Sequence, residues 1–321
     1  MGGFLRDGAW ITEDEWEKGE GGEFQRQDTK FRDWIEDAPE ARFRPEAGRY
    51  HLYVSYACPW AHRTLISRAL LGLEDVVSVS VVDAFMGDQG WTFGAEEDPD
   101  ATPDHLYGVS KLYEIYQKAD PQVSGRVTVP VLWDKELKTI VNNESREIIR
   151  MFSTVMAPLG HGERDLAPEP MREAIDAAMT RFYQPLNNGV YRCGFAGTQS
   201  AYEEAFGQLF AELDHWEKVL GEHRYVAGDQ LTEADIAMFT TLVRFDPVYY
   251  VHFKCNGRLV RQYPNLSGLL RDVYQTPGVR ETVVMSHIKQ HYYRSHPKLN
   301  PRRFVPLGPD LSWYDEPHAR G

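Results

Sequence analysis

The sequence changes from strand to helix within Tyr53-Val-Ser-Tyr-Ala-Cys58-Pro59-Trp60-Ala61-His62-Arg63-Thr64. Residues 50–55 alternate as a strand does, and residues 59–71 predict a helix. Pro59 suits the first helical turn, because the N–H that proline lacks would be unpaired there anyway. The stretch therefore predicts that Cys58 lies at the N-terminus of a helix.

A cysteine in this position predicts chemistry as well as structure. The free amide donors and the helix dipole favour the thiolate of Cys58 over the thiol, and a thiolate can attack sulfur. The alternative is a small apolar side chain that fills a core. Position 61 is Ala61, so the motif contains no second thiol. An attacked sulfur must therefore be released by an external thiol, for which glutathione is the candidate.

Length and composition limit the classes of function. The chain has 321 residues, of which 42% are hydrophobic, and these values predict a globular protein of about two domains. The net charge of −13 argues against nucleic acid or an anionic membrane as partner. Residues 1–40 show no signal-peptide pattern, and no apolar run is long enough to span a bilayer. A working thiolate favours a reducing compartment, so we expect a cytoplasmic protein.

The spacing of the cysteines predicts neither disulfides nor a metal. Cys58, Cys193 and Cys255 are too far apart in sequence to suggest a disulfide framework or a ligand cluster. We expect Cys193 and Cys255 to be inert packing residues. No metal and no nucleotide cofactor is expected.

The elements that follow Cys58 occur in the order of a thioredoxin-like domain. A strand at 76–83 completes a βαβ unit whose crossover is expected to be right-handed. A long insertion at 84–125 follows, with a helix predicted at 110–118, and loops of this length are usually functional or disordered. Two strands and a helix then complete the domain, at 127–133, 139–143 and 144–152.

The whole chain is predicted to be α/β followed by all-α. The predicted segments are an irregular N-terminal arm at 1–48, the thioredoxin-like domain at 49–156, a Pro/Gly-rich linker at 157–170, a helical domain at 171–294 and a tail of ordered coil at 295–321. In the helical domain, Thr232-Glu-Ala-Asp235 predicts a capping box with Asp in place of the usual Glu or Gln. Asp235 is thus expected to be structural rather than catalytic.

Two further motifs allow both a structural and a functional interpretation. Val129-Pro130 enters a predicted strand, where proline commonly marks an edge or bulge. In a thioredoxin-like domain, a cis proline here would turn Val129 toward the cysteine, so that Val129 could pair with an extended peptide. Asn142-Asn143-Glu144-Ser145 could simply cap a helix. It could also offer amides and Ser145 to a carboxylate, and Glu144 to an α-ammonium, which are the two ends of a γ-glutamyl group.

Together these motifs strongly resemble those of the glutathionyl-hydroquinone reductases, the xi class of glutathione transferases, which is related to the omega class. The resemblance covers nearly the whole chain. It is carried by Cys58-Pro-Trp-Ala-His-Arg-Thr, Arg126-Val-Thr-Val-Pro-Val-Leu-Trp-Asp, Asn142-Asn-Glu-Ser, Asn188-Gly-Val-Tyr-Arg, Arg244-Phe-Asp, His252-Phe-Lys-Cys-Asn, His287-Ile-Lys-Gln-His-Tyr-Tyr, Asn300-Pro and Val305-Pro-Leu-Gly-Pro.

The resemblance implies a thioredoxin-like glutathione-binding domain followed by an all-helical glutathione-transferase domain. It implies that Cys58 attacks the glutathione sulfur of a glutathionyl-hydroquinone, and that a second glutathione, as co-substrate, releases the mixed disulfide. The glutathione contacts that it implies are Trp91, Arg126, Val129, Pro130, Glu144 and Ser145. Arg126 could pair with the glycyl carboxylate.

The resemblance also implies an aromatic pocket for the hydroquinone, which could be halogenated, and a homodimer. Tyr191, Tyr249 and Tyr292 match tyrosines that line this pocket, and Tyr191 and Tyr292 are the implied catalytic proton donors. Tyr250 and Tyr293 are immediate neighbours that a shift of one residue would exchange with them. An omega-like thioltransferase or dehydroascorbate reductase would use the same cysteine without the tyrosine pocket. A non-enzymatic binding module remains a third alternative.

Overall fold

The computed structural model describes residues 3–12, 19 and 21–320. Residues 1, 2, 13–18 and 20 of the predicted arm, and residue 321 of the predicted tail, lie outside the described residues. The described chain forms two compact units. The first comprises 3–12, 27–164 and 281–297, and the second comprises 19, 21–26, 165–280 and 298–320. Within these described ranges, no helix combines the length and the apolar character that crossing a membrane requires.

The first unit is built on a four-stranded mixed sheet in the order β4-β3-β5-β6. Strand β3 (Tyr50–Val54) pairs in parallel with β4 (Val77–Val81) and antiparallel with β5 (Val131–Asp134). Strand β6 (Thr139–Asn142) pairs antiparallel with β5 at one edge. All residues of β3 are buried, because this strand has a neighbour on each side and helices over its faces.

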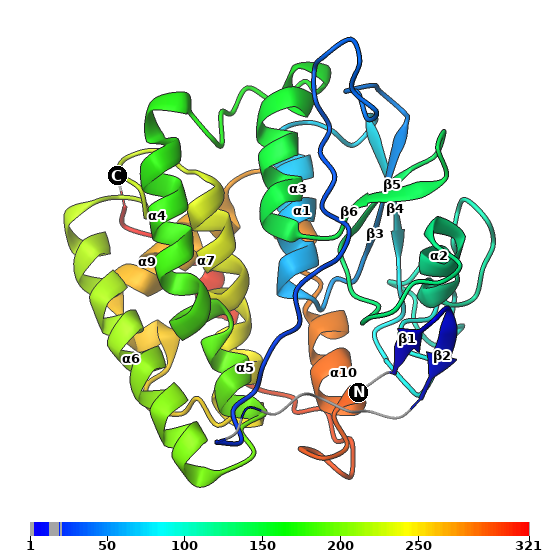
Figure 1. The fold of residues 1–321 in the computed structure, drawn as a ribbon. Coiled ribbons are helices and arrows are strands. Elements are labelled where there is room, and N and C mark those ends of the chain that lie inside the picture. Colours follow the sequence, from blue (N-terminus) through cyan, green and yellow to red (C-terminus); the bar gives the residue numbers. More distant parts are fainter. Residues whose placement is uncertain (1–2, 13–18, 20, 321) are drawn as a thin grey trace. The chain divides into compact units, whose positions relative to one another are not determined.

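Helices pack on both faces of this sheet. Helices α1 (Pro59–Leu70) and α3 (Ser145–Met151) lie side by side on one face, whereas α2 (Leu112–Ala119) lies on the other (Figure 1). This is the thioredoxin-like arrangement that the element order predicts. Further helical segments of this part of the chain are a π-helical turn (Phe152–Met156), a 3₁₀ turn (Ala157–Leu159) and α10 (Met285–Ser295).

A buried histidine joins the two parallel strands. The ring of His51 on β3 lies between two serine hydroxyls of β4, with Nδ1 2.8 Å from Ser78 Oγ and Nε2 3.0 Å from Ser80 Oγ. Burial lowers the pKa of His51 to about 3, because the charged ring is disfavoured away from water. His51 is therefore neutral at physiological pH.

The third strand begins later than the sequence analysis expects. A strand was predicted from residue 127, but β5 begins at Val131. Pro130 has no N–H for the ladder, and the Val129–Pro130 peptide bond is cis. The backbone of Thr128 bonds instead to the hydroxyl of Tyr116 on α2.

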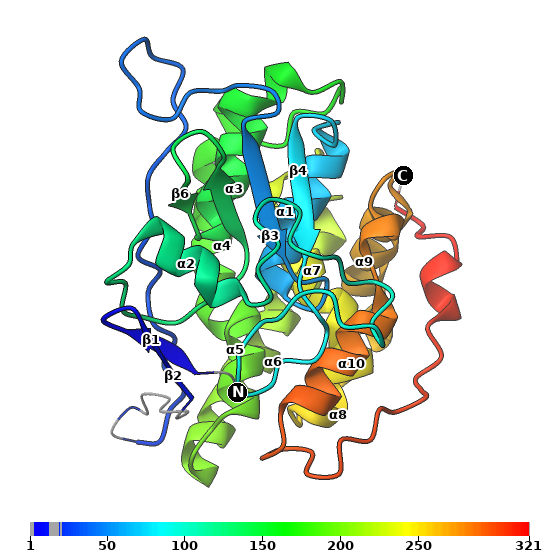
Figure 2. The same ribbon diagram turned by 90° about the vertical axis from the view of Figure 1, so that its right-hand side faces the viewer.

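The N-terminal arm contains a β-hairpin that the sequence analysis treats as irregular chain. Strands β1 (Phe4–Arg6) and β2 (Ala9–Ile11) pair antiparallel around Asp7-Gly8. Both turn residues have positive φ, 49° and 77°, and Asp-Gly is a preferred sequence for such a turn. The hairpin lies beside α2 (Figure 2). The rings of Trp10 on the hairpin and Tyr113 on α2 stack at a centroid distance of 4.6 Å.

Hydrogen bonds to buried carboxylates order the predicted insertion at 84–125. The carboxylate of Asp104 accepts bonds from the backbone N–H groups of residues 106, 107 and 109, and from the hydroxyl of Tyr53 on β3. Asp83, just beyond β4, accepts bonds from the Thr92 hydroxyl and the Ala95 N–H. The insertion is thus an ordered loop tied to the central strands.

The second unit is a helical bundle (Figure 1). Helix α7 is buried along its length and packs against α4 and α9, which makes it the core helix. The helices are α4 (Arg172–Phe182), α5 (Gly189–Gly194), α6 (Gln199–Glu222), α7 (Glu233–Arg244), α8 (Tyr250–His252) and α9 (Pro264–Gln275). Short 3₁₀ or π segments lie at Glu169–Met171, Tyr183–Asn187, Phe245–Tyr249, Val260–Gln262, Arg280–Thr282 and Ser312–Asp315.

The capping box predicted at the start of α7 is confirmed. Asp235 Oδ2 accepts bonds from the backbone N–H and the hydroxyl of Thr232, at 2.9 and 3.0 Å, and Oδ1 accepts one from the Val226 N–H at 2.7 Å. Burial raises the pKa of Asp235 to about 6, although these donors oppose the shift. Asp235 therefore holds the end of the core helix.

Candidate active site

Cys58 occupies the N-cap of α1, and Pro59 is the first helical residue, as the strand–Cys-Pro–helix pattern predicts. The thiol is partly exposed and donates a hydrogen bond to the carbonyl oxygen of Val129, with Sγ and O 3.4 Å apart. The backbone forms a turn, because Cys58 N–H donates to the Ser55 carbonyl at 3.2 Å. The structure thus brings the predicted nucleophile and the predicted peptide-pairing residue together.

The turn that carries Cys58 is supported by α10. Ser55 Oγ accepts a bond from Ala57 N–H at 3.2 Å and lies 3.4 Å from Nε2 of His287. The side chain of His287 is fully buried, and its Nδ1 lies 3.8 Å from Asp98 Oδ2. A histidine of α10 therefore supports the backbone just before the cysteine, and an aspartate of the insertion lies next to that histidine.

Ser145 is the first residue of α3 and lies beside a buried guanidinium. Its hydroxyl accepts a hydrogen bond from Nη1 of Arg63 at 3.4 Å, and Arg63, on α1, is only 2% exposed. A cation and a hydroxyl in one place suit a carboxylate, since charge-assisted hydrogen bonds are the stronger kind.

Glu144 is the N-cap residue of α3. Its carboxylate accepts a bond from the Arg146 N–H at 3.1 Å, and its own N–H donates to the Asn142 side-chain oxygen at 2.7 Å. The capping interpretation of this motif is therefore correct. Because Glu144 is only partly buried, its carboxylate also remains accessible to a ligand.

The rings of Trp91 and Tyr292 both pack against the ring of His291. Trp91 lies in the insertion and stacks on the ring of His291 from α10, at a centroid distance of 4.8 Å and an interplanar angle of 21°. The Nδ1 atom of His291 lies 2.9 Å from the carbonyl oxygen of Ala84. The ring of Tyr292 meets that of His291 edge-on at 5.3 Å and is 2% exposed.

Arg126 directly follows Gly125, which is hydrogen-bonded to the N-terminal hairpin. Gly125 and Leu5 exchange two backbone hydrogen bonds, of 2.8 and 2.9 Å. Arg126 itself is partly exposed in the irregular segment before Val129. All predicted glutathione contacts therefore belong to the first unit, together with Cys58 and Tyr292.

The other two predicted pocket tyrosines belong to the second unit. The rings of Tyr191 and Tyr249 are 5.9 Å apart, and Tyr249 stacks on Phe253 at 5.5 Å with an interplanar angle of 9°. The guanidinium of Arg26 lies 5.0 Å from the centre of the Tyr191 ring. Tyr249 is completely buried in this aromatic cluster, whereas its neighbour Tyr250 is partly exposed.

None of the three cysteines, all of which lie among the described residues, forms a disulfide. Cys193 and Cys255 are buried, and the Cys255 thiol lies 3.9 Å from the carbonyl oxygen of Val190. Burial and the neighbouring Cys193 side chain raise the pKa of Cys255. In the part of the chain that the structure describes, no group of three or more His, Cys, Asp or Glu side chains could hold a metal ion.

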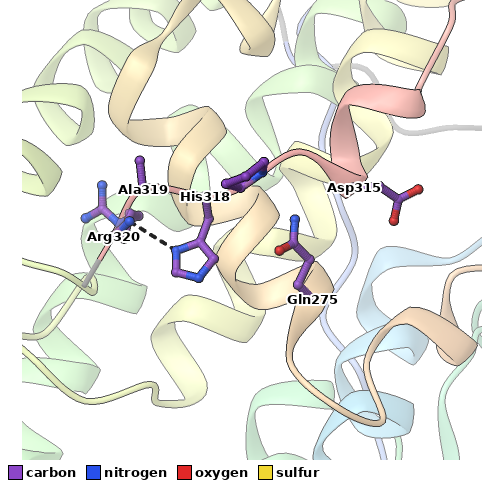
Figure 3. A pocket seen from close by; sticks show the side chains of 6 residues that line it. Gln275, Asp315, His318, Ala319 and Arg320 are labelled. Carbon is purple, nitrogen blue, oxygen red and sulfur yellow. Dashed lines mark hydrogen bonds between the residues drawn. The ribbon is translucent and has the colours of Figure 1, made fainter.

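A surface hollow of about 430 Å³ lies along the tail and contains none of the predicted site residues. Figure 3 shows the side chains that line it, with the hydrogen bond from the Arg320 N–H to Nδ1 of His318, and two of these side chains hold the tail in place. Gln275 donates to the carbonyl oxygens of Tyr314 and Glu316, and Arg320 donates to those of Leu220 and Arg224, among others. The hollow is lined by Gln275, Asp315, Pro317, His318, Ala319 and Arg320.

Comparison with known proteins bears directly on this arrangement. Two family models match, described as "Glutathione S-transferase, N-terminal domain", at residues 57–155, and "Glutathione S-transferase, C-terminal domain", at residues 199–272. Glutathionyl-hydroquinone reductase YqjG of Escherichia coli is 52% identical over 328 residues, which cover 99% of this chain and 98% of that protein. The chain belongs to the glutathionyl-hydroquinone reductase family.

Solved structures agree with this assignment. The xi-class glutathione transferase of Natrialba magadii has a TM-score of 0.93 at 54% identity, with 99% of this chain and 96% of that chain covered. The glutathione-bound structure of YqjG from Escherichia coli has a TM-score of 0.90 at 49% identity, with 99% of each chain covered. The predicted family and the predicted fold, a thioredoxin-like domain followed by an all-helical transferase domain, are therefore confirmed.

Sequence analysis missed the side chains that support the reductase's predicted site. His287 and His291 lie four residues apart, one turn of α10, so both can face the same side of the helix. This spacing is visible in the motif His287-Ile-Lys-Gln-His-Tyr-Tyr, in which only the tyrosines have a predicted role. Tyr116 lies at a buried position of α2, where its helical spacing predicts packing alone.

Proposed function

We propose that this reductase reduces S-glutathionyl-hydroquinones to hydroquinones at the expense of glutathione. The single observation that carries the proposal is the partly exposed thiol of Cys58 at the N-cap of α1, 3.4 Å from the Val129 carbonyl oxygen. The amide donors of the first turn stabilise a thiolate at this position. The names of the relatives support hydroquinone conjugates as the class of substrate.

In the first step, the Cys58 thiolate attacks the glutathione sulfur of the conjugate. A sulfur–sulfur bond forms and the bond from sulfur to the aromatic ring breaks. The electron pair of the broken bond stays on the ring carbon, which takes up one proton, so the hydroquinone leaves reduced. Cys58 is then a mixed disulfide with glutathione.

In the second step, a second glutathione thiolate attacks the mixed disulfide at the glutathione sulfur. Oxidised glutathione leaves and the Cys58 thiolate is regenerated. Two glutathione sulfurs are thus joined for each hydroquinone released. The absence of a cysteine at position 61 is consistent with this external resolution.

We propose that glutathione is held by Trp91, Arg126, Val129, Pro130, Glu144 and Ser145. The Val129 backbone would pair with the cysteinyl unit, which directs its sulfur toward Cys58. The carboxylate of Glu144 would bind the α-ammonium, and Ser145, with Arg63 behind it, the α-carboxylate. Arg126 would pair with the glycyl carboxylate.

Tyr191, Tyr249 and Tyr292 are the proposed contacts of the hydroquinone, and Tyr191 and Tyr292 the proposed proton donors. A tyrosine can stack on an aromatic ring and donate its hydroxyl proton as well. We further propose a homodimer. We also propose a cytoplasmic location, because a cysteine that works as a thiolate needs a reducing compartment. The proposed glutathione-binding domain spans 49–156, and the proposed helical domain spans 171–294, of which residues 281–294 belong to the first compact unit.

The proposal is tested by incubating the protein with glutathione and a glutathionyl-hydroquinone and measuring hydroquinone release by chromatography. We expect turnover with the wild-type protein and none with Cys58→Ala. Turnover by Cys58→Ala would overturn the mechanism. A wild-type protein that reduces dehydroascorbate or mixed disulfides, but not the conjugate, would favour the omega-like alternative.

A further inference from the structure

The hydroxyl of Tyr116 lies at a junction of the first unit. Tyr116 belongs to α2, and only 2% of its surface is exposed. Its hydroxyl donates a hydrogen bond to the Thr128 carbonyl oxygen at 2.8 Å and accepts one from the Thr128 N–H at 3.2 Å. It also accepts one from the side-chain amide of Asn143 at 3.1 Å.

These three bonds use the full capacity of the group. A phenolic hydroxyl has one donor hydrogen and two acceptor lone pairs. Burial raises the pKa of Tyr116, so the hydroxyl keeps its proton and remains able to donate and accept at once. Phenylalanine at this position would leave the buried side-chain amide of Asn143 and the partly buried backbone of Thr128 without this partner.

The two segments joined by this hydroxyl are the ones that carry proposed glutathione contacts. Thr128 directly precedes Val129, whose carbonyl oxygen faces the Cys58 thiol. Asn143 directly precedes Glu144 and Ser145. Two further polar groups of Asn143 have partners, because its N–H donates to the Phe31 carbonyl at 3.0 Å and its side-chain oxygen accepts from the Phe31 N–H at 3.3 Å.

We propose that Tyr116 is a positioning residue for glutathione, whose hydroxyl fixes the segment of Val129 relative to the segment of Glu144 and Ser145. The inference rests on the proposed function, since it takes those residues as glutathione contacts. A tripeptide that spans both segments is bound well only when their spacing is fixed in advance. The Tyr116 hydroxyl bonds to Thr128 and Asn143, whereas Cys58 is held by its backbone bond to Ser55 and by the bond from its thiol to the Val129 carbonyl oxygen.

The test is Tyr116→Phe, which removes one oxygen atom. Tyr113→Phe is the matched control, because it removes a hydroxyl from the same helix; among the described residues this hydroxyl bonds only to the Gln89 side chain, at 3.4 Å. We expect Tyr116→Phe to raise the glutathione Kd by about tenfold, the equivalent of one hydrogen bond of about 1.4 kcal/mol. The KM for glutathione should rise in parallel, with kcat at saturating glutathione and the rate of Cys58 alkylation by iodoacetamide unchanged.

A second variant keeps the test decisive if Tyr116→Phe folds poorly. Asn143→Ala removes one of the three partners, and it should raise the glutathione Kd in the same direction. Where Tyr116→Phe and the double variant also fold, a double-mutant cycle should give less than additive changes, because both substitutions break the bond between Tyr116 and Asn143. Additive effects, or a Kd for Tyr116→Phe within twofold of that for Tyr113→Phe, would overturn the proposal.

Failure of this inference can be distinguished from failure of the proposed function. If the wild-type protein neither binds glutathione nor releases hydroquinone from its conjugate, the proposed function is wrong. If the wild-type protein does both and Tyr116→Phe lowers kcat or the alkylation rate with the Kd unchanged, Tyr116 has a structural or catalytic role instead of the proposed one.

Discussion

Replacement of Glu144 tests two roles of one side chain, the helix cap that the structure shows and the glutathione contact that we propose. Its carboxylate caps α3 through the Arg146 N–H at 3.1 Å, and we propose that it also binds the α-ammonium of glutathione. Glu144→Gln keeps an oxygen that can accept from Arg146 and removes the charge. Glu144→Ala removes both.

The two changes predict different magnitudes. Loss of an N-cap side chain costs about 1 kcal/mol of unfolding free energy, so only Glu144→Ala should be destabilised by that amount. A hydrogen bond to a charged group contributes about 1.5–3 kcal/mol, against about 1 kcal/mol for a neutral one. Because Glu144 is partly exposed, solvent screening favours the lower end. Glu144→Gln, which can keep a neutral hydrogen bond, should therefore lose about 0.5 kcal/mol and weaken glutathione binding about two- to threefold.

The assay pairs calorimetric titration with reduced glutathione and urea unfolding of the same samples. We expect Glu144→Gln to unfold like the wild-type protein and to bind glutathione less tightly. Glu144→Ala should show both defects. Unchanged glutathione affinity in Glu144→Gln would refute the proposed ammonium contact, and equal loss of stability in the two variants would refute the capping argument.

The remaining predictions concern pH and the hydroquinone. His51 has a folded pKa of about 3 and an unfolded pKa of about 6.5. As the pH falls below 6.5, the His51 ring takes up a proton in the unfolded chain but not in the folded protein. The contribution of His51 to the free energy of unfolding is therefore present above pH 6.5 and is lost as the pH falls toward 3. Between pH 7 and 5 this loss is about 2 kcal/mol, and urea unfolding of His51→Gln should show a pH dependence weaker by that amount; an unaltered dependence contradicts it. Tyr191→Phe and Tyr292→Phe should each slow hydroquinone release from the conjugate but leave the rate of Cys58 alkylation by iodoacetamide unchanged, and unchanged release in both removes their proposed role.

Elements with strong local signals were predictable from the sequence. Cys58 lies at the start of α1 because Pro59 can occupy only a few positions in a helix, and Asp235 lies in its capping box because the spacing of that motif is local. The hairpin at Asp7-Gly8 had a local signal as well. It was missed because its strands are only three residues long and show no sustained alternation.

The histidines that support the site could not be predicted, because their role depends on contacts between residues that are far apart in the sequence. His287 is 232 residues from Ser55, and His291 is 207 residues from Ala84. Neither pairing can be predicted from the local sequence pattern. The start of β5 was misjudged for a similar reason, since Thr128 bonds to Tyr116 of α2 rather than to a neighbouring strand.

Intact-protein mass spectrometry tests the central claim most directly. The protein is mixed with one equivalent of glutathionyl-hydroquinone without free glutathione. The mass of the intact protein gives the number of added glutathionyl groups, and peptides from a digest show which cysteine carries them. The account predicts one glutathionyl group on Cys58, none on Cys193 or Cys255, and release of an equal amount of hydroquinone. An unmodified Cys58 together with released hydroquinone would contradict it.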